Sequence, residues 1–311
     1  MNILYLAHRI PFPPNKGDKL RSFRQLERLA KRHRVWCACF VDDPADRAHV
    51  ATLSAYCHDL AVVRLDRRRA TLRGIGGLTF GRTITESFYS HPKMTAVLER
   101  WTQDVAFDVV VAFSSSMAPY ALQVPATRRV LDLCDLDSQK WLDYAASSRG
   151  PVRPLYVAEG NRLALKEQAW LDAFDATILI TKAEAEALGE VQAEAKASGK
   201  LHIVGNGVTL PDPFTTINRG WVEEDSDQPV IGFVGAMDYR PNADAVCWFV
   251  ENCWEGIRKA FPRAVFRIVG RSPVKKVRQL QSVPGVEVVG AVEDVLAEVL
   301  QFTVSVAPMQ I

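Results

Sequence analysis

The fold of this chain is decided by residues 2–21, which read NILYLAHRIPFPPNKGDKLR. The apolar run Asn2 to Ala7 has the length and composition of a buried strand. A proline-rich loop follows, and Lys16, Gly17 and Asp18 then precede a segment with apolar residues at helical spacing. A strand, a loop with a glycine and a helix, in this order, are typical of the first unit of a parallel α/β sheet.

The same alternation continues along the chain. Short β-branched runs are each followed by a segment of helical period, which predicts parallel sheets covered by helices. A long helix is expected at about residues 155–173. The expected strands of the first series are 2–7, 34–41, 60–65, 108–113, 129–133, 176–180 and 201–204.

Prolines, a glycine and an acidic run interrupt this pattern at residues 206–229 and predict a linker. A second α/β series follows, with strands at 230–234, 264–269, 286–289 and 303–306 and helices near 243–260, 274–281 and 292–300.

We therefore predict two Rossmann-like, doubly wound parallel-sheet domains that face a cleft. The first comprises residues 1–205 and the second residues 230–311. Only five residues follow the last expected strand. Because a parallel sheet needs helices on both faces, the second domain is expected to be incomplete, as in a truncated chain.

Charge is distributed unevenly along the 311 residues, although the formal net charge is only +2. The first hundred residues hold 18 basic and 9 acidic side chains, with seven cations between Lys19 and Arg34 and five more between Arg64 and Arg73. Such a basic helix can face an anionic membrane, or it can be an ordinary solvated helix. Nucleic acid is not expected as a partner, because no recognition motif accompanies these cations.

The first apolar run is too short for a signal peptide, so we expect a cytoplasmic protein. Its basic domain would place it peripherally on the inner face of the plasma membrane. Six cysteines without Cys-x-x-Cys spacing predict reduced thiols and no bound metal. The spacing Asp135-x-Asp137 leaves a small metal alternative open.

Two groups of residues in the first domain are candidates for chemistry. Lys16, Gly17 and Asp18 stand where a strand meets a helix, where backbone N–H groups can bind phosphate or a sugar. The alternative is a turn stiffened by proline. Asp135 and Asp137 follow the fifth strand and are the catalytic candidates, although Asp137 or Ser138 could instead cap a helix.

The second domain has two turns in which a glycine ends a strand and an arginine follows. Gly235 precedes Arg240 and Asn242 in the first turn, and Gly270 precedes Arg271 in the second. Two cationic turns at strand ends predict a phosphorylated ligand. The patterns Gly-x-Gly-x-x-Gly and Gly-Lys-Ser/Thr are absent from these turns, which disfavours a dehydrogenase or a P-loop enzyme.

Several motifs resemble the GT-B glycosyltransferases of family 4. They are the Gly17 loop, Asn206-Gly207-Val208, Phe233-Val234-Gly235, Ile268-Val269-Gly270, and Val286 to Gly290 with Val292. Three further stretches are similar to the subgroup of sugar transferases associated with exosortase (PEP-CTERM) systems and exopolysaccharide synthesis. They are His8-Arg9-Ile10-Pro11, Asp135-Leu136-Asp137-Ser138 with Trp141, and Met237 to Asn242.

The resemblance implies retaining, metal-independent transfer of a hexose-like sugar from a nucleotide diphosphate-sugar, as co-substrate, to a glycan or lipid-linked acceptor. It places the base near Val292 and the diphosphate on the helix N-termini that follow Gly235 and Gly17, with Arg240 and Arg271 on the leaving group. The family's Glu-x7-Glu segment is absent from these residues, so a truncated chain is expected to be inactive. A sugar-nucleotide epimerase of the same architecture and a non-catalytic two-domain binding protein are the alternatives.

Overall fold

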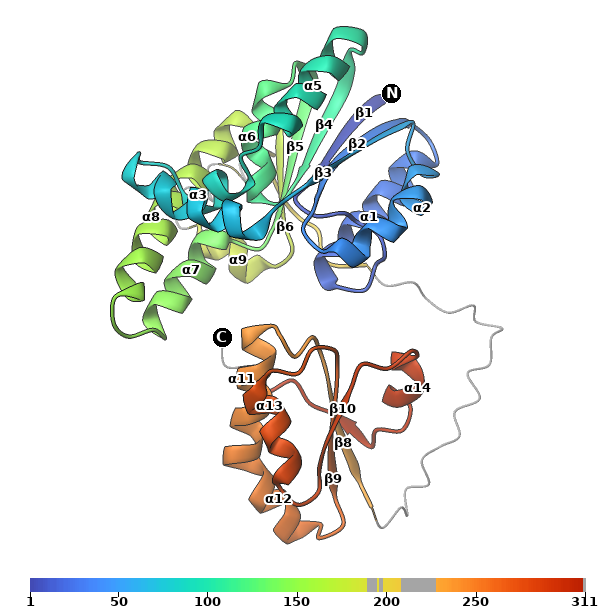
Figure 1. Ribbon diagram of the computed structural model, residues 1–311, viewed down its shortest axis with the longest axis vertical. Coiled ribbons are helices and arrows are strands. Elements are labelled where there is room, and N and C mark those ends of the chain that lie inside the picture. The colour runs from blue at the N-terminus through green and yellow to red at the C-terminus, as the bar shows by residue number, and fades with distance from the viewer. Residues whose placement is uncertain (189–194, 196–197, 208–227, 310–311) are drawn as a thin grey trace. The chain divides into compact units, whose positions relative to one another are not determined.

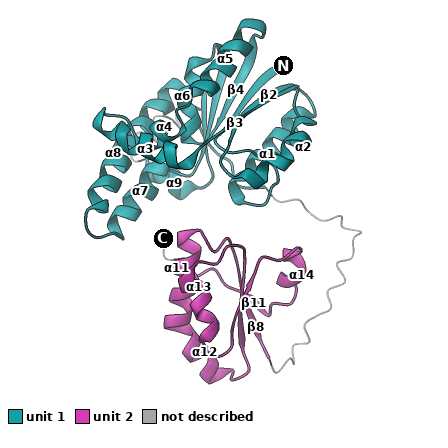
Figure 2. Cartoon of the chain, viewed as in Figure 1, with its two compact units in different colours: residues 1–208 teal, residues 209–311 magenta. Residues whose placement is uncertain are grey.

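The computed structural model describes residues 1–188, 195, 198–207 and 228–309. The chain divides into two compact units, Met1–Val208 and Thr209–Ile311 (Figure 2). Of the expected linker 206–229, residues 208–227 lie outside the described residues. Each unit is a parallel α/β layer structure, which confirms the predicted fold class.

The first unit is built on a parallel sheet of seven strands in the order β3-β2-β1-β4-β5-β6-β7 (Figure 1). The two strands predicted nearest the N-terminus, Asn2–Ala7 and Arg34–Val41, have the expected bounds. The strands are β1 (Asn2–Ala7), β2 (Arg34–Val41), β3 (Asp59–Arg64), β4 (Phe107–Phe113), β5 (Ala126–Cys134), β6 (Ala176–Leu179) and β7 (Leu201–Ile203).

Helices connect these strands. The sequence pattern did not locate the helices between β3 and β4. The segment between β3 and β4 holds α3 (Arg67–Thr79), α4 (Ile84–Tyr89) and α5 (Pro92–Asp104). The other helices of the unit are α1 (Gly17–Ala30), α2 (Val50–Ser54), α6 (Ala118–Gln123), α7 (Asp137–Ala146), α8 (Val152–Ala173) and α9 (Lys182–Ala187).

Both faces of the first sheet are buried, because alternate residues of β1 enter different cores. Leu4 and Leu6 pack in one core with residues of α5, α6 and α8, whereas Ile3, Tyr5 and Ala7 pack in the other with residues of α1 and α2. Figure 1 shows these two groups of helices on opposite sides of the sheet. This double cover explains why β1 reads as an uninterrupted apolar run.

The long helix α8 carries two buried glutamates that receive the N-termini of neighbouring helices. Glu159, which is fully buried, accepts hydrogen bonds from Ile84 N and, at 2.8 Å, from Thr85 N at the start of α4. Glu167 accepts from Ser138 N at 3.1 Å and from the Ser138 hydroxyl at the start of α7. Each carboxylate thus satisfies N–H groups that a helix leaves without an internal partner.

The second unit is a parallel sheet of four strands in the order β10-β9-β8-β11. The helices α11, α12 and α13 lie on one side of this sheet and α14 on the other (Figure 1). Trp254, Phe249 and Phe266 form the centre of the core under the first three helices. The elements are β8 (Val230–Val234), α11 (Arg240–Phe249), α12 (Glu255–Ala260), β9 (Val265–Val269), α13 (Lys275–Gln279), β10 (Val286–Gly290), α14 (Val295–Val299) and β11 (Val304–Ser305).

Candidate functional site

The chain order of the first sheet reverses between β1 and β4. From β1 the chain goes on to β2 on one side, and β4 pairs with β1 on the other side, with Ala7 opposite Phe113. The loops after these two strands therefore start side by side and diverge. Ligands of open α/β sheets bind at such a point, beyond the carboxyl ends of the strands.

His8 lies at this point and joins the two loops. Its ring stacks on Phe113, with ring centroids 6.0 Å apart and planes 9° apart, and meets Tyr89 edge-on at 5.9 Å. Nε2 lies 3.5 Å from Oδ2 of Asp18. Nδ1 is buried and has no hydrogen-bond partner among the described residues. The imidazole is thus held in place by aromatic packing and by one carboxylate.

Asp18 and Arg9 form the charged centre of this edge. The Arg9 guanidinium donates to Asp18 Oδ2 at 2.8 Å and lies 3.5 Å from Asp42 Oδ1. Burial alone would raise the pKa of Asp18, but the His8 hydrogen bond and the Arg9 charge outweigh it and hold that pKa well below its usual range. Burial, with the charges of Asp42 and Asp137, raises the pKa of Tyr89 to about 12.

The predicted phosphate contact at Lys16, Gly17 and Asp18 forms the N-terminus of α1. Lys16 is the N-cap residue, and its side chain makes no capping hydrogen bond. A Cβ atom at Gly17 would meet nothing within 4 Å, so the glycine leaves open space there. Asp18 already binds Arg9 and His8 and adds a negative charge, so Lys16 and the backbone are the groups suited to an anion.

The two catalytic candidates lie in different surroundings. Asp137 is the first residue of α7 and accepts a hydrogen bond from the Ser115 hydroxyl, which follows β4. Asp135 is exposed. The alternative that Asp137 or Ser138 caps this helix is wrong, because Leu136 is the N-cap residue and the Ser138 hydroxyl donates to Glu167.

Asp135 has an acidic neighbour that the sequence did not indicate. Burial raises the pKa of Glu184, in α9, and the nearby carboxylate of Asp135 raises it further. Glu184 also completes a capping box with Thr181, whose hydroxyl donates to it at 2.9 Å. The carboxyl ends of β5 and β6 thus bring two carboxylates together, a pairing that shifts proton affinities at functional sites.

A buried ion pair lies next to the carboxyl edge of the first sheet, near the end of β5. Asp132, in β5, is fully buried and accepts from Arg21 Nε at 2.9 Å, from Gln25 Nε2 and from Cys134 N at 3.0 Å. Arg21 also donates to Asn206 Oδ1 at 3.1 Å. The sequence offered no signal for this pair, because its two members lie 111 residues apart.

The second unit builds its edge from glycines rather than from ion pairs. Gly235 N donates to Val269 O at 3.0 Å, and Gly270 N donates to Gly290 O at 2.7 Å. Gly270 has φ +155°, and a Cβ atom there would lie 1.7 Å from Gly235 O. Only glycine lets these strand ends approach so closely, and their hydrogen bonds fix the loops after β8, β9 and β10 together.

The predicted donor residues lie in the turns and loops that follow these glycines in the chain. The Asn242 side chain donates to Ala236 O at 3.1 Å and thus shapes the turn, and Arg271 O accepts from Met237 N at 2.9 Å. Arg240, the first residue of α11, lies 3.4 Å from Asp244. Val292 is half-buried in the loop before α14. Lys276, which the sequence did not single out, also pairs with Asp244.

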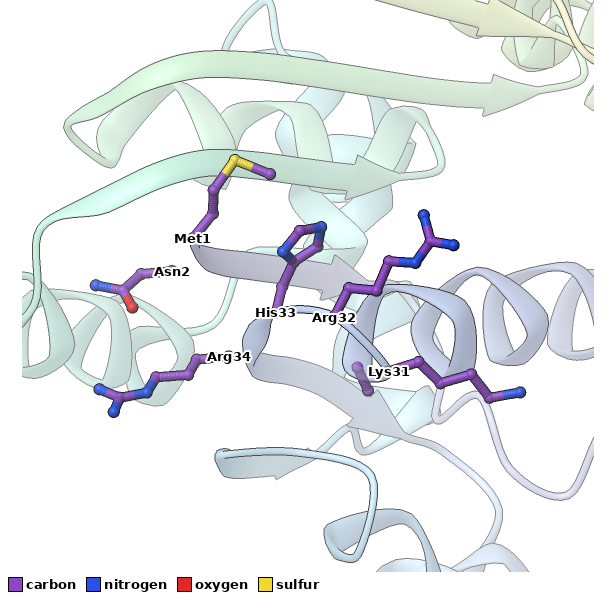
Figure 3. A pocket seen from close by; sticks show the side chains of 7 residues that line it. Met1, Asn2, Lys31, Arg32, His33 and Arg34 are labelled. Atoms are coloured by element: carbon purple, nitrogen blue, oxygen red, sulfur yellow. The ribbon is translucent and has the colours of Figure 1, made fainter.

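One hollow of about 520 Å³ lies at the end of the first sheet opposite to its carboxyl edge. It is at the amino ends of β1 and β2, with Lys31, Arg32, His33 and Arg34 around it (Figure 3). Because open α/β sheets bind ligands at the opposite ends of their strands, we do not assign the reaction to it. In the described part of the chain, no helix is long and apolar enough to cross a membrane.

Residues 228–310 match the family model "Glycosyl transferases group 1". No curated protein matches the chain. This domain and the fold together support a GT-B glycosyltransferase.

Solved structures share the fold at low sequence identity. TarM is 9% identical with a TM-score of 0.59, covering 99% of this chain and 80% of that protein. The catalytic domain of starch synthase IV from Arabidopsis thaliana, bound to ADP and acarbose, is 13% identical with a TM-score of 0.54, covering 96% and 76%. The N-terminal domain of trehalose-6-phosphate phosphatase from Candida albicans is 12% identical with a TM-score of 0.52, covering 90% and 66%.

Proposed function

We propose that the protein is a retaining, metal-independent glycosyltransferase of family 4 that acts in exopolysaccharide synthesis. It transfers a hexose from a nucleotide diphosphate-sugar to a glycan or lipid-linked acceptor. The observation that carries this proposal is the edge of the second unit formed by Gly235, Gly270 and Gly290, which lies inside the matched residues 228–310. Arg271 directly follows one of these glycines, and Arg240 begins the helix after another. Close backbone packing with cations at strand ends suits a diphosphate.

In this proposal the second unit holds the donor. Backbone N–H groups at the start of α11 and the two arginines bind the diphosphate, and the base lies near Val292. As the bond between the anomeric carbon and the diphosphate oxygen breaks, the cations stabilise the negative charge on the leaving group. The proposed donor contacts are Gly235, Arg240, Asn242, Gly270, Arg271 and Val292.

The first unit would hold the acceptor. Asp135 and Asp137 accept hydrogen bonds from its hydroxyl groups, and Lys16 with the N–H of Gly17 binds a phosphate. Asp18 orients His8 and Arg9. The acceptor oxygen forms the new bond to the anomeric carbon on the face that the diphosphate leaves, and the hydroxyl proton passes to the leaving diphosphate. We also propose that the protein is cytoplasmic and binds peripherally to an anionic membrane surface.

Nucleotide binding tests the donor half of this proposal. Thermal shift and calorimetry with UDP, GDP and ADP should find one nucleotide that raises the melting temperature. The Arg271→Ala variant should bind that nucleotide about 1.5 to 3 kcal/mol more weakly, the contribution of a charge-assisted hydrogen bond. The matched control is Arg263→Ala, which changes an exposed arginine at the amino end of the same strand, β9.

Equal affinity in the Arg271→Ala and Arg263→Ala variants would contradict the placement of the donor. Incubation of the full chain with the nucleotide sugar alone separates the reaction classes. Conversion of that sugar to its epimer without an acceptor would contradict a transferase.

A further inference from the structure

Helix α3 packs on its neighbour through small residues. Ala70, Gly74 and Gly77 are its buried positions. A Cβ atom at Gly74 would lie 3.0 Å from Ile84 Cγ2, and one at Gly77 would lie 2.0 Å from the Ser87 oxygen. Because both partners belong to α4, the two helices touch almost backbone to backbone. This close approach fixes which face of α3 points outward.

Exposed apolar side chains lie on α3 and at its C-terminal cap, Phe80. Leu72, Ile75 and Phe80 are 73%, 48% and 83% exposed, and Phe80 and Leu72 are the two most exposed large apolar side chains among the described residues. Leu165, which is 69% exposed, lies one turn along α8 from Arg162, whose guanidinium binds Leu78 O at 2.8 Å. We call Leu72, Ile75 and Phe80 the α3 apolar face. Exposed large apolar side chains that gather on one element among polar residues are typical of a binding surface.

Cations surround this face. Residues 64–82 contain six arginines and one acidic residue, Asp66, whose carboxylate caps α3 by accepting from Arg68 N and Arg69 N. Arg68 and Arg69 are exposed in the first turn. A hollow of about 470 Å³ beside the helix is lined by four cations, Arg64, Arg69, Arg73 and Lys93, together with His91 and Asp66. Phosphate groups are the chemistry that such a rim attracts.

Helix α1, which the sequence suggested as the membrane-facing element, is less suited to this role. Lys19 is 2% exposed, and its ammonium lies 2.7 Å from Asp46. The Arg21 side chain is buried against Asp132. The expectation that the cations of this helix form one solvent face is wrong for these two residues, since both make ion pairs inside the unit.

We propose that α3 docks on an anionic lipid bilayer. Leu72, Ile75 and Phe80 enter the boundary between headgroups and acyl chains, while Arg68 and Arg69 lie among the lipid phosphates. Apolar residues with neighbouring cations on one exposed helix are the requirements for interfacial binding. Figure 1 shows α3 at the periphery of its unit. This inference rests on the proposed membrane contact and assigns it to a particular helix.

Vesicle flotation with the full chain tests the assignment. Vesicles of phosphatidylcholine alone are compared with vesicles that contain phosphatidylglycerol, at low and high salt. We expect capture by the acidic vesicles only, weakened by salt. Arg68→Glu/Arg69→Glu should reduce the vesicle partition coefficient at least about fivefold, since one cation at a charged surface contributes about that factor. Leu72→Ser/Phe80→Ser should reduce it at least about fivefold as well, because it removes two apolar side chains from the interface.

Two control variants match these changes in size and charge. Arg32→Glu/Arg34→Glu alters two exposed cations at the amino ends of the strands, and Leu122→Ser alters an exposed leucine of α6. Both should bind acidic vesicles within about twofold of the unmutated protein, because interfacial binding by a helix needs apolar and cationic groups on that same helix. Circular dichroism checks that every variant is folded.

The possible failures are distinguishable. If acidic vesicles do not capture the unmutated protein, both the membrane contact and the α3 assignment are overturned. Capture that the α3 substitutions leave unchanged, or that the two controls reduce equally, overturns the α3 assignment alone. If Leu72→Ser/Phe80→Ser instead converts a dimer to a monomer in sedimentation without affecting vesicle capture, the apolar face binds a second copy and the proposal is wrong. None of these outcomes depends on sugar transfer.

Discussion

The carboxyl edges of the two sheets occupy the same position in the same kind of layer structure, yet they are held together differently. The edge of the first sheet depends on charged side chains, of which the buried pair of Arg21 and Asp132 is an example. The edge of the second depends on backbone contacts between Gly235, Gly270 and Gly290. An edge held together by side chains can adjust to a substitution, because neighbouring side chains can rotate. An edge held together by backbone contacts has no side-chain atom that can move out of the way.

Gly270→Ala should have the largest effect. The new Cβ atom would lie 1.7 Å from the carbonyl oxygen of Gly235, and the residue has positive φ, so no rotamer relieves the clash. We expect the free energy of unfolding of the second unit to fall by more than about 4 kcal/mol, a loss that few single substitutions cause. Chemical denaturation followed by tryptophan fluorescence, to which Trp254 contributes, measures it.

The control for this change is Gly256→Ala in α12, where a Cβ atom would meet nothing within 4 Å. That substitution should stabilise the helix by up to about 1 kcal/mol, because alanine favours the helical backbone. If the two variants unfold alike, close backbone contact does not hold the edge of the second sheet together, and the two edges do not differ in the way described above.

Asp132→Ala should have the next largest effect. It removes the carboxylate that pairs with Arg21 and leaves a side chain that is 7% exposed with an uncompensated charge. Breaking a buried pair in this way costs about 3 to 5 kcal/mol. Urea denaturation measures the loss. Asp104→Ala, at the exposed end of α5, is the matched control and should change stability by less than about 0.5 kcal/mol.

A smaller, pH-dependent effect is expected from Glu167. Burial raises its pKa from 4.5 to about 7. Between these values the folded chain keeps a proton that the unfolded chain has lost, so this group lowers stability as pH rises from about 4.5 to about 7. The Glu167→Gln variant lacks this slope, and its stability relative to the unmutated protein should increase across that window by on the order of 2 kcal/mol.

Denaturation curves at pH 5 and pH 8 measure this difference. The exposed Glu99→Gln variant serves as the control and should follow the unmutated protein. Parallel curves for all three proteins would mean that Glu167 is ionised in the folded state throughout, and that its site beneath α7 is not as dry as its 1% exposure indicates.

The sequence predicted the strands well and the supporting polar contacts poorly, for a physical reason. A strand buried on both faces must be apolar along its whole length, so β1, β2 and β8 could be located to the residue. The strand-end glycines were recognised for a similar local reason. Glu159 and Glu167 look like solvent-facing helix residues in the sequence, and only the packing of α4 and α7 against α8 shows that they are buried.

Long-range pairing and helix orientation were also beyond the sequence. Nothing near Arg21 indicates that it meets Asp132, and Lys19 looks like one cation of a basic surface although it is buried. The outward direction of Leu72 depends on which glycines of α3 contact α4, which is a property of the packed pair. Features that depend on local backbone geometry were therefore easier to predict than contacts that depend on distant partners.

The two glutamates of α8 have a consequence for the order in which the first unit forms. Helices α4 and α7 have six and ten residues, too short to persist alone in water. The first turns of α4 and α7 donate hydrogen bonds to Glu159 and Glu167, which lie about two helical turns apart on α8. Helix α7 loses the carboxylate that holds its first turn once α8 departs, so α7 and α8 melt together, whereas α4 keeps its capping box of Thr83 and Glu86. The sheet edge at Asp137 is therefore only as persistent as a helix that contributes no residue to it.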